Sequence, residues 1–445
     1  MIDNYRGAMA YLESLMERDR DKDKHAGLAR MWALLNAMGN PQEAYSTVHI
    51  GGTAGKGSTA MILAAILKNS GYKTGLHVSP HLEDARERMQ VNGKFIPVEM
   101  FVELVNYIMP FIEKVHDELG YGWPSYFEAL IALTFECFKR EKVDVAVIEV
   151  GMGGEYDGTN VISPLVTVLT NVGLDHTEYL GNTVEKIARE KVGIFKQGID
   201  VMSGVSKPSV VRIAKAKAKK SICRLYLLDR EIKWKLVKYG NSTMIFDFQF
   251  DREALKHLAL SASGEYQIRN ASLSVAAALS LRKHNFKISE SSIRRALGNI
   301  HLPGRFEIVG RKPTVILDGA HNPMKMEALV STLVHNYKNK KIKVVFASKK
   351  GKNVGEMLST IGKVADTFYF TKFQATTDFG KNMSHDPSEL QRHTKVRSLL
   401  FDNASEAYRK ALEEAGKTDT ICVTGSLYLV GELRSQINRR RDAIF

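Results

Sequence analysis

The chain has little of what marks a secreted, disulfide-bonded or membrane-spanning protein. Its 445 residues include only three cysteines, Cys137, Cys223 and Cys422, which lie far apart. Three is an odd number, and the spacing fits neither a disulfide framework nor a zinc site, so a reducing compartment is expected. The N-terminal residues lack a basic segment followed by an apolar core, and aliphatic runs such as 61–67 are too short to span a bilayer. We therefore expect a cytoplasmic protein without membrane contact.

Internal repeats and low-complexity segments are also absent, and basic residues outnumber acidic ones by 63 to 49. This excess of positive charge suggests an anionic partner such as nucleic acid, phosphates or a polycarboxylate. Basic residues cluster at 212–220, 338–343 and 439–441. No aromatic residues interleave with them as in nucleic-acid-binding motifs, so solvated surface charge is the simpler interpretation and no nucleic-acid partner is expected.

The stretch from Val48 to Ser58 predicts a phosphate-binding loop. A short β-branched run ends at two glycines, and a third glycine, Lys56 and Ser58 follow before a helical pattern over 59–68. Backbone N–H groups and the helix dipole at such a turn favour an anion. Lys56 adds a charge for terminal phosphates, and the Ser58 hydroxyl can bind magnesium. A glycine-rich turn without a ligand is the alternative.

Apolar runs alternate with helical patterns along most of the chain. Strands are expected at 73–78, 143–150 and 165–170, with helices over 5–38 and 99–140. This alternation is typical of a doubly wound, mostly parallel sheet covered on both faces. Residues 224–262 alternate in shorter runs and predict a small antiparallel excursion. Beyond 301–304 the alternation restarts, which predicts a smaller Rossmann-like α/β domain. We thus expect an α/β protein with domains at 1–300 and 301–445.

Polar residues follow the predicted strands where ligands of parallel sheets gather. Glu149 lies within an apolar strand, where a carboxylate is costly unless it is paired or bound to a metal. A structural salt bridge is the alternative for Glu149, and a loop contact is the alternative for His176. Lys191, taken alone, reads as a solvated helix lysine.

The phosphate loop has the short form Gly-Thr-x-Gly-Lys-Gly-Ser, which resembles the Mur ligase superfamily and, within it, the folylpolyglutamate and dihydrofolate synthases. Further segments over 48–428 match this family in order: Ser125-Tyr-Phe-Glu-Ala, Gly173-Leu-Asp-His-Thr, Gln267 with Asn270, Pro303-Gly-Arg-Phe-Glu, Asp318-Gly-Ala-His-Asn-Pro and Val423-Thr-Gly-Ser.

The resemblance implies ATP and magnesium as cofactors, L-glutamate and a reduced folate as substrates, and a monomer. It implies catalytic roles for Lys56, His176 and Lys191, the last of them carbamylated. It implies an ATP site formed by Gly52, Thr53, Gly55, Lys56, Gly57, Ser58, Thr59, Asn270, Arg305 and Asp318. The metal ligands would be Ser58, Ser79, Glu149 and His176, and the substrate would meet Ser79, His81, Phe127, Asp157 and His321.

Three residues depart from the family pattern: Ala54 replaces an asparagine, Tyr266 a histidine and Glu155 an arginine. The expected reaction is ATP-dependent addition of L-glutamate to the γ-carboxylate of a folate through an acyl phosphate. Dihydrofolate synthesis, alone or combined with it, is the nearest alternative. A nucleic-acid-stimulated ATPase and a family member that binds without turnover are remoter ones.

Overall fold

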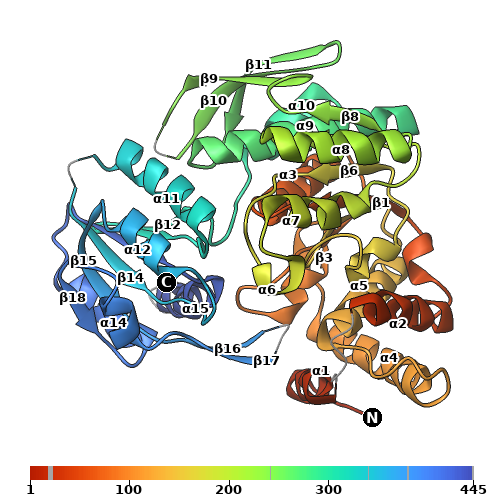
Figure 1. Cartoon of the computed structure of the whole chain (residues 1–445), viewed down its shortest axis with the longest axis horizontal. Helices are drawn as coiled ribbons and strands as arrows, with labels where there is room; N and C mark the ends of the chain where they lie inside the picture. Colours follow the sequence, from red (N-terminus) through yellow and green to blue (C-terminus); the bar gives the residue numbers. More distant parts are fainter. Residues whose placement is uncertain (19–23, 241, 339, 378–379, 443–445) are drawn as a thin grey trace.

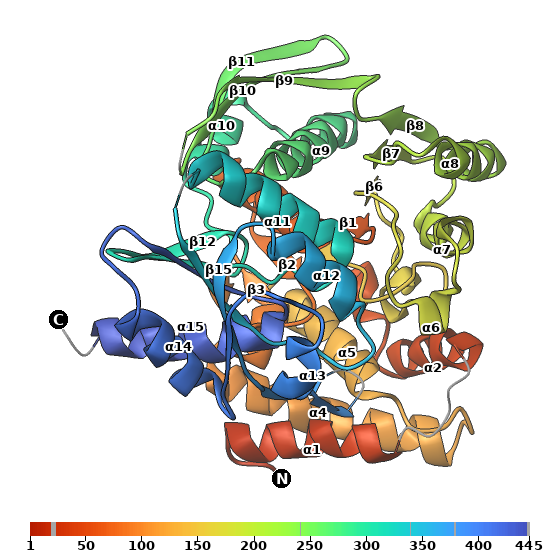
Figure 2. The same ribbon diagram turned by 60° about the vertical axis from the view of Figure 1, so that its left-hand side comes forward.

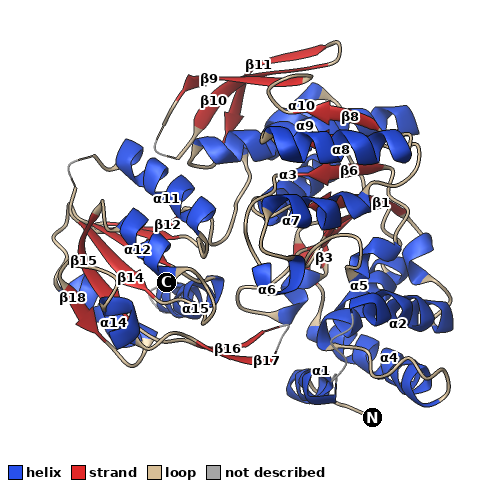
Figure 3. Ribbon diagram, in the orientation of Figure 1, coloured by secondary structure: helices blue, strands red, loops and turns tan. Residues whose placement is uncertain are grey.

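The computed structural model describes residues 1–18, 24–240, 242–338, 340–377 and 380–442. Figure 1 shows two α/β bodies side by side, the N-terminal one from red to green and the C-terminal one from cyan to blue. Each body is a central sheet with helices on both faces, as Figure 3 shows. Among the described residues, no helix is long and apolar enough to cross a membrane.

The first sheet has eight strands. In spatial order they are β4 (Lys94–Phe95), β3 (Gln90–Val91), β2 (Thr74–His77), β5 (Val145–Glu149), β1 (Ser46–Gly51), β6 (Val166–Leu169), β7 (Asp200–Ser203) and β8 (Arg224–Leu227). From β2 to β8 all neighbours pair in parallel, and only β3 and β4 add an antiparallel edge. The predicted doubly wound, mostly parallel sheet is confirmed.

Helices cover both faces because the central strands are apolar on both sides. In β5, Val145 and Val147 face one core, and Ala146 and Ile148 face the other. On the first face lie α3 (Lys56–Asn69), α9 (Glu265–Leu281) and α10 (Glu290–Gly298). On the second lie α1 (Tyr5–Arg18), α2 (Lys24–Ala37), α4 (Val98–Asp117), α5 (Tyr126–Arg140), α7 (Val184–Lys191) and α8 (Pro208–Lys220), with α6 (Thr177–Leu180) nearby.

The antiparallel excursion is smaller than the sequence suggested. It consists of β9 (Ile232–Lys238), β10 (Met244–Phe250) and β11 (Glu253–Leu260) in the order β11-β10-β9. β8, which we had expected to belong to it, pairs in parallel with β7 and closes the main sheet. The inward residues of β10, Phe246, Phe248 and Phe250, pack into the same core as α3 and α9, so this sheet caps that face (Figure 1).

The second sheet has six strands. Their order is β12 (Glu307–Arg311), β13 (Thr314–Leu317), β19 (Thr420–Thr424), β14 (Ile342–Phe346), β15 (Ala365–Phe370) and β18 (Ser398–Leu400). One face carries α11 (Pro323–Asn336), α12 (Val354–Ile361) and α13 (Pro387–Gln391), and the other carries α14 (Ala404–Glu413) and α15 (Leu427–Asp442). The predicted Rossmann-like alternation is confirmed, whereas β12, β18 and the hairpin β16 (Gln374–Thr377) and β17 (Gly380–Met383) were not foreseen.

Figure 2 brings the C-terminal body forward, and side-chain hydrogen bonds connect this body to the N-terminal one at several points. Arg434 on α15 bonds to Glu307 on β12 and to Glu83 of the N-terminal body. The carboxylate of Asp175, which follows β6, accepts hydrogen bonds from two residues of the C-terminal body: from Lys352 Nζ at 2.7 Å and from Asn322 Nδ2 at 3.0 Å. These contacts hold the carboxyl ends of the strands of both sheets around a common cleft.

Candidate active site

The phosphate loop connects β1 to α3 as the sequence predicted. Gly55 caps α3 with a φ of 81°, a left-handed conformation that glycine adopts without strain. The loop is fixed from the end of β6: Asn171 Oδ1 accepts from Ala54 N at 2.8 Å, and Thr170 Oγ1 donates to Ala54 O at 2.7 Å. Both hydrogen bonds involve the backbone of Ala54. The side chains of Thr170 and Asn171 therefore fix the loop at this position, and the side chain of residue 54 does not.

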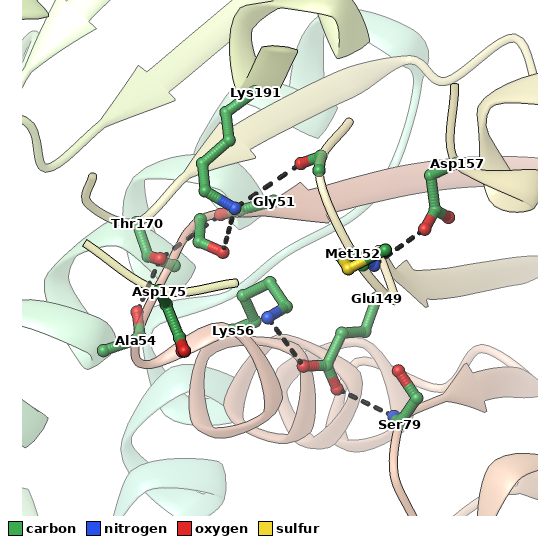
Figure 4. A network of polar contacts seen from close by, with 12 residues as sticks. Gly51, Ala54, Lys56, Ser79, Glu149, Met152, Asp157, Thr170, Asp175 and Lys191 are labelled. Carbon is green, nitrogen blue, oxygen red and sulfur yellow. Dashed lines mark hydrogen bonds and ion pairs between the residues drawn. The ribbon is translucent and has the colours of Figure 1, made fainter. Parts of the chain in front are cut away.

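Figure 4 shows the polar network around the loop. Lys56 Nζ lies 3.9 Å from Glu149 Oε1, and Ser79 N donates to Glu149 Oε2 at 3.1 Å. Burial raises the pKa of Glu149, while Lys56 and the Ser79 amide act against that shift. Ser58 Oγ accepts from Gln267 Nε2 at 3.4 Å. A carboxylate and a hydroxyl, both hard oxygen donors, thus face the helix N-terminus together.

A first cavity of about 560 Å³ opens in front of this loop. Most of the residues predicted for ATP and metal line it: Gly52, Thr53, Gly55, Lys56, Gly57, Ser58, Ser79, Glu149, His176, Lys191, Asn270, Arg305 and Asp318. Of the predicted ATP-site residues, Thr59 alone lies outside this lining, because its side chain is buried within α3. Tyr266 lines the cavity where the family pattern has a histidine.

Lys191 lies at the end of α7. Its helical context alone predicts a solvated side chain, but the residue is buried. Its Nζ donates to Gly52 O at 3.0 Å and lies 3.5 Å from Gly153 O. Burial and the nearby Lys56 lower the pKa of Lys191 to about 7. A substantial fraction of this amine is therefore neutral and nucleophilic near neutral pH.

His176 follows Asp175 at the entrance of α6 and has a left-handed φ of 51°. Burial lowers its pKa to about 3, so the imidazole is neutral at ordinary pH. Burial alone would raise the pKa of Asp175, but the ammonium groups of Lys325 and Lys352 lower it well below its usual value. A neutral imidazole thus stands beside a permanent carboxylate that ties the two bodies together.

A second cavity of about 830 Å³ lies on the other side of Ser79 and His176. Phe127 and Asp157, both predicted to meet the substrate, line it, and so do Tyr156, Tyr179 and Tyr428. Its wall also contains Arg30, whose guanidinium bonds to Glu128 Oε1 and Oε2. Arg30 was not predicted, because it lies on a helix that the sequence marks only as packing.

The carboxylate of Asp157 is largely used within its own loop. It accepts from Met152 N at 2.8 Å, from Thr159 N at 3.0 Å and from Thr159 Oγ1 at 2.5 Å. Thr159 Oγ1 lies 2.9 Å from Nε2 of the buried His49. Asp157 therefore shapes the loop between β5 and η3 (Gly158–Val161). Glu155, which stands where the family pattern has an arginine, is exposed and lines neither cavity.

The C-terminal body contributes the opposite wall. Asp318 accepts from Phe306 N and Ala320 N, and burial raises its pKa to about 6. His321 Nδ1 lies 2.8 Å from Gly319 O, and its Nε2 lies 3.0 Å from Lys325 Nζ. Lys325 was not among the predicted residues, since its helical context resembles a surface position.

The two cavities share a wall that includes Ser79, Met152, His176, His321 and Leu427. His81, also predicted for the substrate, lines neither cavity; its Nδ1 accepts from Arg88 Nε at 3.0 Å. A ligand group at the shared wall would face Lys56 from one side and the second cavity from the other.

Two α/β bodies with a phosphate loop at their common cleft define a ligase of the Mur type. In agreement, a model described as "Mur ligase middle domain" matches residues 125–278, and one described as "Mur ligase, glutamate ligase domain" matches residues 304–427. The dihydrofolate synthase/folylpolyglutamate synthase of Bacillus subtilis (strain 168) is 33% identical over 418 residues, covering 92% of this chain and 95% of that protein. The chain belongs to the folylpolyglutamate synthase/dihydrofolate synthase family, as the sequence motifs predicted.

Solved structures agree over nearly the whole chain. The structure titled "E. coli FolC in complex with DHPP and ADP" has a TM-score of 0.86 at 28% identity and covers 99% of both chains. The "FPGS-AMPPCP-folate complex" has a TM-score of 0.84 at 30% identity and covers 98% of this chain and 100% of its own. Both bodies and their arrangement are therefore shared with enzymes of this family.

Proposed function

We propose that this protein is a folylpolyglutamate synthase, which uses ATP to join L-glutamate to the γ-carboxylate of a reduced folate. The observation that carries the proposal is the shared wall at Ser79, His176 and His321, where the phosphate-loop cavity meets the aromatic-lined one. An enzyme that phosphorylates a carboxylate needs the nucleotide and the acceptor to meet end to end. The relatives' complexes with ADP, AMPPCP, DHPP and folate support both ligand assignments.

The first cavity would hold ATP. Residues 52–58 would surround the phosphates with backbone N–H groups and Lys56, as a loop at a helix N-terminus does. Asn270, Arg305 and Asp318 would contact the rest of the nucleotide from α9 and the C-terminal body. Contact from both bodies would exclude water from a reactive acyl phosphate. We place the boundary between the two domains at residues 300 and 301, in the segment that connects α10 to β12; Leu302, just beyond it, still packs in the core of the N-terminal body.

The donor set in this cavity fits magnesium. The ion prefers hard oxygen ligands from one or two carboxylates together with nucleotide phosphates. Glu149 and Ser58 offer a carboxylate and a hydroxyl beside the loop, and Ser79 and the neutral His176 are further candidates. When bound, magnesium would neutralise phosphate charge.

Lys191 is proposed to carry a carbamate. Its amine is buried beside Lys56 and its pKa is lowered to about 7, which favours the neutral form that attacks CO₂. Carbamate formation joins the amine nitrogen to the carbon of CO₂ and releases one proton. It would convert one of the cations around the cavity into an anion beside the magnesium site.

The second cavity would hold the folate and the incoming glutamate. Phe127 and the tyrosines offer apolar faces to a pterin ring, and His321 and Ser79 stand at the reacting end. The folate carboxylate oxygen attacks the terminal phosphorus of ATP, and ADP leaves. The glutamate amine, after losing a proton, attacks the acyl carbon, and phosphate leaves with its bonding electrons. Lys56 stabilises the charge of the transferring group.

The test is phosphate release with ATP, magnesium and L-glutamate in the presence of tetrahydrofolate, dihydropteroate or no pterin. Tetrahydrofolate should give release and a product heavier by one glutamyl residue, read by mass spectrometry. Absence of glutamate-dependent release with any pterin contradicts the proposal. Release with DNA or RNA in place of folate would point instead to the ATPase alternative.

Dihydrofolate synthesis is the second candidate, because the Bacillus subtilis relative carries both names and the E. coli FolC complex contains DHPP. It uses the same acyl-phosphate chemistry on the carboxylate of dihydropteroate. A product one glutamyl residue heavier than dihydropteroate, in the same assay, would establish it.

A further inference from the structure

Lys325 is a cation in the cleft that the reaction outlined above does not use. It lies in the first turn of α11, where Asn322 Oδ1 caps the helix by accepting from Lys325 N at 2.9 Å. Its side chain lines the first cavity, and its Nζ lies 3.0 Å from His321 Nε2. The cap therefore fixes the point from which this lysine reaches the cleft.

The pairing with His321 has a defined direction. His321 Nδ1 lies 2.8 Å from Gly319 O, a carbonyl that can only accept, so Nδ1 carries the proton. Nε2 is then the unprotonated nitrogen, and Lys325 Nζ donates to it. His321 lines both cavities. Lys325 thus reaches the shared wall from the side of the first cavity.

Among the residues that the structure describes, no carboxylate lies within 4.0 Å of Lys325 Nζ, and the Asp175 carboxylate acts on it from farther away. Its neighbour Lys352, by contrast, is paired with Asp175 at 2.7 Å. Burial is the main cause that lowers the pKa of Lys325 to about 7; the Asp175 carboxylate acts against this shift, and Lys56 and Arg305 act in the same direction as burial. Six lysines and arginines and four aspartates and glutamates line the first cavity, and this excess of basic residues favours an anionic ligand there.

We propose that Lys325 is a further catalytic residue, whose ammonium binds the terminal phosphoryl group of the nucleotide opposite Lys56. Lys56 comes from the N-terminal body and Lys325 from the C-terminal one, so the transferring group is contacted from both sides only when the cleft is closed. This assignment rests on the proposed function, since it takes the first cavity as the ATP site. Lys325 also keeps His321 uncharged at the shared wall, because it uses the Nε2 lone pair.

The test compares the affinity for ADP with that for AMPPCP, both with magnesium and without folate or glutamate, by calorimetry. A charged hydrogen bond to phosphate predicts that Lys325→Met weakens AMPPCP binding by about tenfold to hundredfold. ADP binding should change by less than about threefold, because ADP lacks the terminal group. Lys325→Arg, which keeps the charge, should recover part of the AMPPCP affinity and of kcat.

Lys410→Met is the matched control, since Lys410 lies on α14 and pairs at the surface with Glu413 and Glu414. Equal losses for ADP and AMPPCP, or no loss for either, overturn the assignment. Failure of the wild-type protein to bind either nucleotide overturns both the assignment and the proposed function. Selective loss of AMPPCP binding without glutamate-dependent turnover in the wild type supports Lys325 and refutes only the proposed ligase activity.

Discussion

At the scale of single residues, the cleft places a buried carboxylate, whose charged form is costly on its own, close to a lysine. Glu149 is buried at the end of β5 and has Lys56 as its nearest cation, at 3.9 Å. A distance of this size leaves Lys56 available to a ligand while still partly balancing the carboxylate. Lys56 is therefore available to bind phosphate, and Glu149 is available to bind a metal ion.

Lys56→Ala should abolish most turnover. Removing one charged donor to a transferring phosphoryl group lowers kcat by roughly a hundredfold to a thousandfold. Phosphate release with tetrahydrofolate and glutamate measures the effect. Lys68→Ala, at the exposed far end of the same helix, is the control and should retain wild-type rates. Retained activity in Lys56→Ala would refute the phosphate-loop assignment.

Carbamylation of Lys191 should depend on pH. Because its folded pKa is about 7, the neutral amine predominates above that pH and is lost as the pH falls below it. The carbamate, followed by native mass spectrometry or by NMR with isotope-labelled bicarbonate, should therefore decrease sharply from pH 8 to pH 6. An unmodified Lys191 at every pH with saturating bicarbonate would contradict the proposal.

At the scale of elements, the loop from Gly151 to Gly154 borders both cavities. Gly151 packs directly against the ring of Phe127, which follows the capping box at the start of α5. A side chain at residue 151 therefore has to move that ring.

Gly151→Ala should weaken binding in the second cavity. The added methyl group displaces the Phe127 ring from the wall of the second cavity, and a loss of about 1.4 kcal/mol of binding free energy there would raise KM for folate by about tenfold. Gly298→Ala, where the added atom meets open space, should leave KM unchanged. An unchanged KM in Gly151→Ala would show that Phe127 does not contact the folate.

The sequence predicted the elements best where one signal was strong. The strand, turn and helix around Lys56 combine β-branched residues, glycines and an apolar helix, and the structure places them as expected. β8 was misassigned because its four residues alternate like an antiparallel strand, and only its pairing with β7 reveals its place. Short strands such as β18 carry too few residues for a period to emerge.

The residues of the candidate site were predicted from sequence motifs. The cavity residues that were not predicted lie outside any motif. Arg30 lies on a helix that the sequence marks only as packing, Lys325 lies at what resembles a surface position, and only the packing of the two bodies brings Lys325 to the cleft. His81 was expected at the substrate because it follows Ser79 closely in the chain, but its Nδ1 accepts from Arg88 and it lines neither cavity.

At the scale of the whole molecule, Arg434 connects the two bodies. It contacts Glu83 on one side and Glu307 on the other. Burial alone would raise the pKa of Glu307, but hydrogen bonds from His301, Arg434 and Gly304 N hold it at about 2. The folded pKa is thus below the unfolded value, so this carboxylate stabilises the fold above about pH 4.5 and loses that effect as the pH falls toward 2.

Arg434→Met should lower the free energy of unfolding by about 1–3 kcal/mol at neutral pH, because Glu307 remains buried with fewer partners. The deficit should shrink as the pH falls from 4.5 toward 2, when the carboxylate takes up a proton in both proteins. Urea denaturation at several pH values measures this. Arg397→Met, which removes an exposed pair with Glu414, should cost less than about 0.5 kcal/mol. A deficit that is independent of pH would exclude Glu307 as its cause.

The shared wall between the two cavities also has a consequence for inhibition. A molecule that fills one cavity ends close to the mouth of the other, so a short covalent linker past Ser79 and His176 would join two weak ligands into one. The second part would then bind at a high effective concentration, and the affinity of the linked compound would exceed that of either fragment without any new contact. Such a compound would also hold both bodies closed, since each contributes residues to the wall.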